Sequence, residues 1–186
     1  MKRGITLVET VVVISITTLA LFALTNLFLL FNSTYGYQQA VIATAGSAGS
    51  AMNALEAAVL PAKHVLMSHD FSGTTYSSAT TTLVLELPAI DDFGDVLPGA
   101  KDYVVFYASN AVLYRLTEAD AGSARTSGLK LLSTTLNSLA FTYDNGDFAQ
   151  VTNVAVDLET RALVKQEEVL SRLTGQWYLR NWQPSP

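Results

Sequence analysis

The first third of the chain is a long apolar run that carries no charge. Asp, Glu, Lys and Arg are all absent from Thr10 to Leu55, and the stretch from Thr10 to Phe31 is almost wholly apolar. As a helix, these roughly 22 residues would extend about 33 Å, which is enough to cross a bilayer. Its apolar residues would surround the helix on every side, as in a membrane span. They are Val11, Val12, Val13, Ile14, Ile16, Leu19, Leu21, Phe22, Leu24, Leu27, Phe28, Leu29, Leu30 and Phe31.

The flanks of this run indicate its orientation. Lys2 and Arg3 precede it, which favours a cytoplasmic N-terminus, and the tyrosine-containing segment 32–37 follows it at interface depth. A secretory signal peptide is the other interpretation, but its apolar region usually has roughly 7–15 residues and ends near an A-x-A site. The weak match Ala43-Thr44-Ala45 lies about 12 residues too late. We therefore expect a single-pass protein of the cytoplasmic membrane with its C-terminal domain outside.

A helical pattern continues beyond the predicted span, over residues 33–66. Gly46 and Gly49 would each cost about 1 kcal/mol relative to Ala in a helix. Residues 45–51 could instead form a flexible linker, although we favour a helix whose small residues allow close packing. Pro61 predicts an end or a bend near Leu60. The expected buried stripe is Val41, Ala45, Ala48, Met52, Leu55, Val59 and Leu66.

From about Tyr76 the pattern changes to the period of two that is typical of strands. One predicted hairpin turns at Ser109-Asn110, and a second turns through residues 144–147. One long helix followed by antiparallel strands gives the α+β class. The predicted strands are 80–87, 102–108, 111–116, 129–132, 139–143, 151–158 and 177–181.

Three segments in this region are less regular. We expect the first predicted strand to end at Pro88, which cannot donate a ladder hydrogen bond. Residues 91–99 are predicted to form a loop. Residues 164–173 fit either a strand or a helix that starts near Gln166.

Composition narrows the possible functions. Only 15% of residues are charged, against roughly 25% in ordinary soluble domains. The net charge of −5, with no Lys/Arg cluster beyond Lys2-Arg3, argues against direct binding of nucleic acid. The absence of cysteine excludes disulfides, thiol catalysis and thiolate metal sites.

The unusual residue in the N-terminal segment is Glu9, at the head of the apolar run. A carboxylate costs about 2.5–3.5 kcal/mol at the centre of a membrane and less near its surface. Glu9 could simply face lipid headgroups. However, the hexapeptide Gly4-Ile5-Thr6-Leu7-Val8-Glu9 resembles the processing site of type IV prepilins and type II secretion pseudopilins. The chain departs from that family in two respects: Ile5 stands where phenylalanine is commonest, and Asn26 stands where proline is often found.

The resemblance implies a processing pathway for this chain. A membrane-embedded prepilin peptidase would cut between Gly4 and Ile5 and methylate the new Ile5 amine, and Glu9 would be the assembly residue. The implied organisation is a leader at 1–4, a transmembrane and assembly helix at 5–32, an extracytoplasmic helix half at 33–66 and a β-rich globular domain at 67–186. No cofactor is implied. The implied partners are the peptidase, other pilin or pseudopilin subunits, inner-membrane assembly machinery and membrane lipids.

The same resemblance extends to the fold. In a pilin-like fold, the second half of a long N-terminal helix packs on an antiparallel sheet. The segments DYVVFYASNAVLYRL and LAFTYDN and the terminal LRN resemble minor pilins and minor pseudopilins.

The chemistry expected of the motif is simple. Cleavage creates an ammonium at Ile5, which the Glu9 carboxylate of a neighbouring subunit could meet as helices bundle. An unpaired carboxylate in a low-dielectric bundle is expensive, so the pair would act as a register device.

Other candidate sites are weaker. His64 and His69, with Asp70 adjacent, lack the third ligand and the spacing of a zinc site. Asp91, Asp92 and Asp95 are weak calcium candidates, since clustered carboxylates suit a hard cation, but they do not have EF-hand spacing. Residues 144–147 are interpreted as a turn. The chain has no G-x-S-x-G, Walker or G-x-G-x-x-G motif.

Two functions therefore compete. The first is a structural, non-enzymatic subunit, more consistent with a minor than a major one, of a type IV pilus, competence pilus or secretion pseudopilus. The second is a single-pass anchored domain that binds a ligand outside the membrane and never polymerises. An enzyme is a distant third. The acid at Glu9 favours the first.

Overall fold

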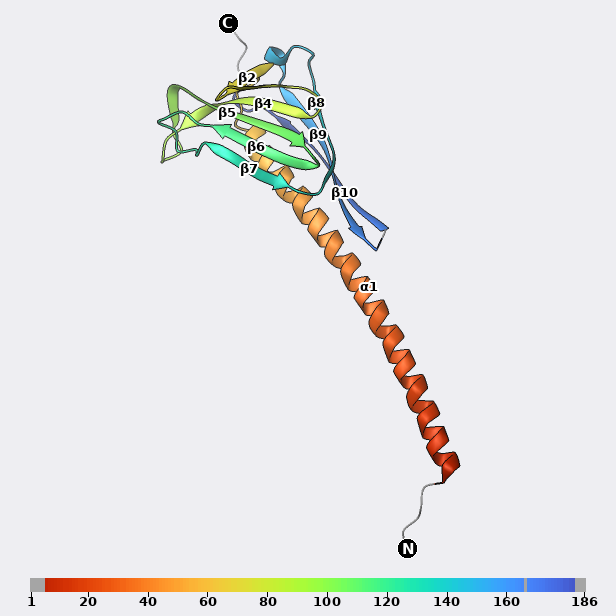
Figure 1. Cartoon of the computed structure of the whole chain (residues 1–186). Coiled ribbons are helices and arrows are strands. Elements are labelled where there is room, and N and C mark those ends of the chain that lie inside the picture. The colour runs from red at the N-terminus through yellow and green to blue at the C-terminus, as the bar shows by residue number, and fades with distance from the viewer. Residues whose placement is uncertain (1–5, 166, 183–186) are drawn as a thin grey trace. The chain divides into compact units, whose positions relative to one another are not determined.

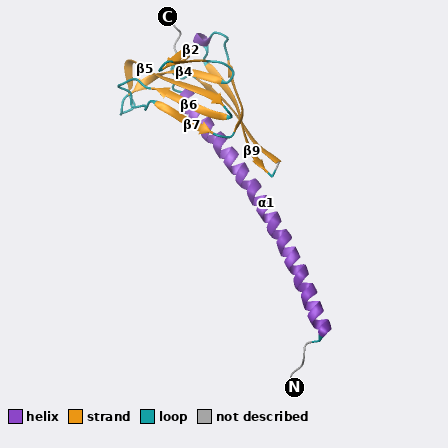
Figure 2. Cartoon of the chain, in the orientation of Figure 1, coloured by secondary structure: helices purple, strands orange, loops and turns teal. Residues whose placement is uncertain are grey.

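The computed structural model describes residues 6–165 and 167–182 (Figure 1). A long helix, α1 (Leu7–Val59), is followed by strands and one short 3-10 helix, η1 (Phe148–Gln150) (Figure 2). This arrangement confirms the α+β class. The chain divides into two compact units, Met1–Ala40 and Val41–Pro186. The strands are β1 (His64–Val65), β2 (Ser68–Phe71), β3 (Thr74–Ser77), β4 (Thr82–Ile90), β5 (Val96–Ser109), β6 (Val112–Glu118), β7 (Gly128–Ser133), β8 (Leu136–Tyr143), β9 (Asn153–Val164) and β10 (Glu167–Tyr178).

All the strand pairs are antiparallel and form three sheets. The largest has the order β1-β4-β5-β6-β7, the second has the order β10-β9-β8, and β2 and β3 form a separate hairpin. The two larger sheets meet where the Phe141 N–H of β8 donates to the Thr80 carbonyl, at 2.7 Å, just before β4. Antiparallel strands need only short connections, which explains how a mostly β unit is built from consecutive elements.

The core of the second unit forms where the end of α1 packs on both larger sheets. Ala48, Met52, Leu55 and Val59 of the predicted stripe are buried there. Val41 and Ala45 are exposed instead, and Leu66 is half-buried and packs on another cluster. The remaining buried apolar residues of this helix end are Ala51 and Ala58. The sheets contribute, among others, Leu83, Leu85, Phe106, Leu113, Phe141, Val154, Val156 and Leu158.

Strand β4 is buried on both faces, which explains why Leu83 to Leu87 are buried without interruption. Leu83 and Leu85 face the helix cluster, whereas Val84 packs with Phe71 and Val105 in a second cluster. The β2–β3 hairpin supplies Phe71 to this second cluster. The sequence analysis missed that hairpin, which consists of short, largely polar strands.

Helix α1 runs through residues 45–51 without a break, so the linker alternative is wrong. The glycines are not what allows close packing, because a Cβ added at Gly46 or Gly49 would meet nothing within 4 Å. The buried alanines Ala48 and Ala51 serve that purpose. The helix ends at Val59, so the predicted helical boundary at residue 66 is wrong.

Pro61 acts as predicted near that end, since it has no N–H to extend the helix. The C-terminal segment then covers the helix end. The Arg180 N–H donates to the Leu60 carbonyl at 3.0 Å, and Asn181 Nδ2 donates to the Pro61 carbonyl at 2.9 Å. Residues 179–181 therefore contact the end of the helix and do not extend the last strand. That strand ends at Tyr178, so the predicted strand 177–181 is wrong.

Further strand predictions are corrected in detail. Strand β4 continues through Pro88 to Ile90, with a register shift at that point. The proline is tolerated because β1 pairs with β4 only at Leu85 and Glu86. The predicted loop 91–99 is shorter, since β5 already begins at Val96.

The remaining hairpins agree better with the sequence patterns. The first turn lies one residue later than predicted, at Asn110-Ala111, where both residues have positive φ. The short strand at 129–132 and the second hairpin around 144–147 are confirmed. In the ambiguous segment 164–173 the strand alternative is right, with Lys165 at positive φ in the β9–β10 turn.

The glycines of α1 and β10 should respond in opposite ways to alanine. We expect Gly46→Ala to stabilise the full-length protein in detergent by about 1 kcal/mol, because the helix propensity improves and the Cβ meets open space. A Cβ at Gly175 would lie 2.7 Å from Met52 Cε and from the Trp177 ring, so Gly175→Ala should destabilise by roughly 1–3 kcal/mol. Denaturant unfolding followed by near-UV circular dichroism measures both. Equal signs would contradict the packing described here.

Candidate functional site

Helix α1 begins with a capping arrangement that involves Glu9. Thr6 immediately precedes the helix, and its Oγ1 accepts a hydrogen bond from the Glu9 N–H at 3.3 Å. The sequence Thr-x-x-Glu at this position is a capping box, in which the third helical residue is acidic. The exposed Glu9 carboxylate also lies in the first turn, at the positive end of the helix dipole. Glu9 therefore also has a local role in stabilising the start of α1. The sequence predictions do not include this role, although the Thr-x-x-Glu spacing indicates it.

The first part of α1 presents an apolar surface on all sides. Its large apolar side chains remain exposed all along the helix from Leu7 to Phe31, each by about half or more of its surface. A soluble helix would bury one face, so this uniform exposure suits an apolar surrounding rather than water.

The polar side chains within this stretch are hydrogen-bonded to the helix itself. Each donates to the carbonyl four residues earlier, at 2.8–3.3 Å. In lipid an unmet donor would cost several kcal/mol, so these internal bonds make the segment compatible with hydrocarbon. The residues are Thr10, Ser15, Thr17, Thr18, Thr25 and Asn26.

By length and composition, α1 is able to cross a membrane, with a mean hydropathy of 2.3 over its most apolar window. Signal sequences near an N-terminus meet the same criteria of length and composition. These criteria therefore support a membrane-associated helix but do not indicate its orientation. Glu9 is the acidic residue that precedes this uncharged stretch. Gly4 and Ile5, the predicted processing residues, lie outside the described residues.

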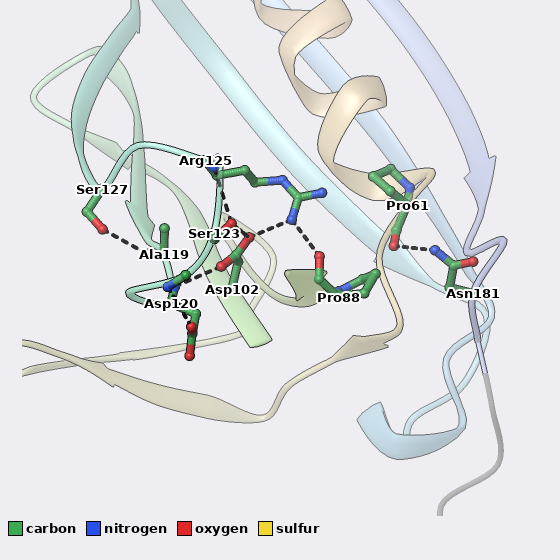
Figure 3. Close-up of polar contacts among 10 residues, drawn as sticks. Pro61, Pro88, Asp102, Ala119, Asp120, Ser123, Arg125, Ser127 and Asn181 are labelled. Carbon is green, nitrogen blue, oxygen red and sulfur yellow. Dashed lines mark hydrogen bonds and ion pairs between the residues drawn. The ribbon is translucent and has the colours of Figure 1, made fainter. Parts of the chain in front are cut away.

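A buried ion pair organises the loop between β6 and β7, as Figure 3 shows. Asp102 of β5 is 0% exposed, and its Oδ2 accepts from Arg125 Nη1 at 2.6 Å and from Ser123 Oγ at 2.8 Å. Its Oδ1 accepts from the Asp120 N–H at 2.8 Å. The same Arg125 nitrogen donates to the Pro88 carbonyl at 2.6 Å. The Asp102–Arg125 pair therefore fastens this loop to β5 through the carboxylate and to β4 through the guanidinium.

Sequence analysis had no means of finding this pair. Asp102 begins the predicted strand 102–108, whereas Arg125 lies 23 residues away, between the predicted strands 111–116 and 129–132. An acid at the head of an apolar strand was the available signal, since a buried carboxylate requires a partner.

The predicted calcium candidates lie in the turn that joins β4 to β5. Asp91 Oδ1 accepts from the backbone N–H groups of Phe93 and Asp95, each at 2.9 Å, so it stabilises the turn itself. Within residues 6–165 and 167–182, no group of three acidic or histidine side chains is arranged to hold a metal ion. Asp92 and Asp95 thus belong to an acidic, hydrogen-bonded turn.

The structure separates His64, His69 and Asp70. His69 stacks on Tyr103, with ring centroids 3.7 Å apart, and its Nε2 lies 3.2 Å from Glu118 Oε2. Asp70 accepts from the Gly73 N–H in the β2–β3 turn at 2.6 Å. Burial lowers the pKa of His64, against the opposing charge of Glu86. These contacts are structural, and they do not converge on a common ligand position.

The turn at 144–147 is also held by its own acids. Asp144 accepts from the Thr152 backbone and hydroxyl, and Asp147 accepts from the Ala149 N–H at the start of η1. Burial alone would raise the pKa of Asp144, but these hydrogen bonds hold it below its usual value.

Comparison of the chain with protein-family models and with characterised proteins gives no match. Its function is therefore inferred from its own residues.

The buried ion pair should dominate the stability of the β6–β7 loop. We expect Arg125→Met to destabilise the full-length protein by about 3–5 kcal/mol, because it leaves the Asp102 charge buried and unpaired. The matched control is Arg161→Met, which removes the exposed Arg161–Glu168 pair and should cost at most about 1 kcal/mol. Urea unfolding measures both, and similar losses would contradict the importance of burial.

Proposed function

We propose that this chain is a prepilin-like protein, processed between Gly4 and Ile5 and assembled through α1 as a structural subunit of a filament. The filament is a type IV pilus, a competence pilus or a type II secretion pseudopilus, and the subunit is a minor one. The partners are a prepilin peptidase, other pilin or pseudopilin subunits, inner-membrane assembly machinery and membrane lipids. The protein itself performs no catalysis.

The observation that carries the proposal is the position of Glu9. It is an exposed carboxylate in the first turn of a helix whose next charged residue is Glu56. The polar side chains from Thr10 to Asn26 are all hydrogen-bonded within the helix, whereas within the described residues the Glu9 carboxylate has no side-chain partner. Such a carboxylate needs a cation from outside the helix, and a new amine at Ile5 of a neighbouring subunit provides one.

The two parts of α1 support a filament role for separate reasons. From Leu7 to Phe31 the apolar surface can contact lipid before assembly and other helices afterwards, because both surroundings are equally apolar. From Ala48 to Val59 the helix is fixed to its own sheets. A subunit built in this way can exchange the partners of its first part without losing its folded domain.

The second candidate, an anchored domain that never polymerises, is favoured by one observation. Glu9 lies in the first turn of α1, three residues after the capping Thr6, where an acidic side chain can serve simply to stabilise the start of a helix. An anchor helix would gain from such a cap, so the acid alone does not decide between the candidates. Glutamine separates them, because it can take the glutamate position of a capping box without charge.

We predict that Glu9→Gln and Glu9→Ala are both cleaved normally but are both lost from sheared filaments of the native host. Loss of the charge removes the partner for the Ile5 amine, while glutamine keeps the capping geometry. Immunoblots of the membrane and filament fractions measure the outcome. Normal incorporation of Glu9→Gln would show that Glu9 acts as a cap and would overturn the assembly role.

We also predict that the mature protein begins with N-methyl-Ile5 and that Gly4→Val abolishes this processing. Intact-mass measurement of the protein purified from host membranes reads both results directly. Gly46→Val is a matched control, because the same substitution within the helix should leave the mass change unaltered. A wild-type chain that retains Met1 would favour the anchored-domain candidate.

A further inference from the structure

Two long strands of the second unit end their sheets without a pairing strand among the described residues. They are β7, at one end of the five-stranded sheet, and β10, at one end of the three-stranded sheet. The opposite ends differ. Strand β1 has only two residues, and β8 is covered where the Phe141 N–H bonds the Thr80 carbonyl. Exposed edges of this kind are templates for pairing with another chain.

The edge formed by β7 is apolar on one face. Leu129 is 59% exposed and Leu131 is 49% exposed, and they lie opposite Leu116 and Tyr114 of β6. Leu116 also packs on the Phe71 cluster that the β2–β3 hairpin covers. The apolar face that the β2–β3 hairpin covers therefore continues as an exposed surface to the free edge of the sheet at β7.

The first half of β10 offers a second exposed edge that carries one leucine. Leu170 is 50% exposed and lies between the charged Glu168 and Arg172 on one face of the strand, while Glu167 is exposed on the other face. On β7, Lys130 likewise lies on the face opposite Leu129 and Leu131, because side chains alternate along a strand. Joining these edges with the leucines on one face places Lys130 and Glu167 together on the other.

We infer that the β7 edge of one copy pairs with the β10 edge, over Glu167–Arg172, of the next copy. Pairing supplies backbone hydrogen bonds, a leucine contact to Leu170 on one face and a Lys130–Glu167 attraction on the other. Since the two edges differ, the contact is heterologous and leaves a free edge at each end. Such a contact can add further copies instead of forming a closed dimer. The inference therefore deepens the proposed filament function and rests on it.

Cysteine cross-linking tests the pairing, because the native chain contains no cysteine. Full-length Leu131→Cys and Leu129→Cys variants are each co-expressed with Leu170→Cys in the host and treated with a short bismaleimide. We expect a product of twice the monomer mass containing one copy of each variant. In the control, the β7 variant is replaced by Ser138→Cys, whose side chain is exposed on β8, and this pair should give no cross-linked product.

A charge exchange tests the same contact independently. Lys130→Glu should abolish the cross-link, and adding Glu167→Lys to the same chain should restore it. Absence of the cross-linked pair in both membrane and filament fractions, or a product containing a different protein, overturns the inference. Filament incorporation and the Ile5 terminus are read from the same samples, so loss of the cross-link with both retained refutes the edge pairing alone.

Discussion

The folding of this chain depends on one helix that meets two different surroundings along its length. From Leu7 to Phe31 no face is buried, and the polar side chains from Thr10 to Asn26 donate hydrogen bonds to carbonyls of the helix itself. From Ala48 onwards a single face is buried against both sheets. A single arrangement of apolar residues could not suit both parts of the helix. The sequence therefore changes from apolar residues on every side to one apolar face along α1. The small alanines of the second part then let the helix approach the sheets closely.

Patterns that extend over many residues were predictable from the sequence. The apolar run, the antiparallel strands and the α+β class all follow from periodicity. What could not be predicted depends on contacts between distant residues. The β2–β3 hairpin is short and polar, and contacts with distant residues hold it to the sheet, among them the packing of Phe71 on Val84 and Val105. Pro88 is tolerated inside β4 because the neighbouring strand β1 stops before reaching it.

The candidate site divides in the same way. Glu9 stood out in the sequence because a charge in an apolar run is conspicuous, and Thr6 completes a spacing that can be recognised without a structure. Asp102 did not stand out, because its partners Arg125, Ser123 and Asp120 come from a loop with no regular pattern. A local motif can be predicted from its spacing, whereas a buried ion pair across 23 residues requires the fold.

Both notable carboxylates illustrate one physical rule with opposite solutions. Asp102 is fully buried, and the chain supplies its cation internally, which fixes a loop permanently. Glu9 is exposed in the first turn of α1, and the sequence contains no Lys or Arg between it and Lys63. An internal partner at Glu9 would make the first turn as self-contained as the β6–β7 loop and would remove any reason for a second molecule to bind there. Under the proposed filament function, this exposed charge is what the amine of a neighbouring subunit would neutralise.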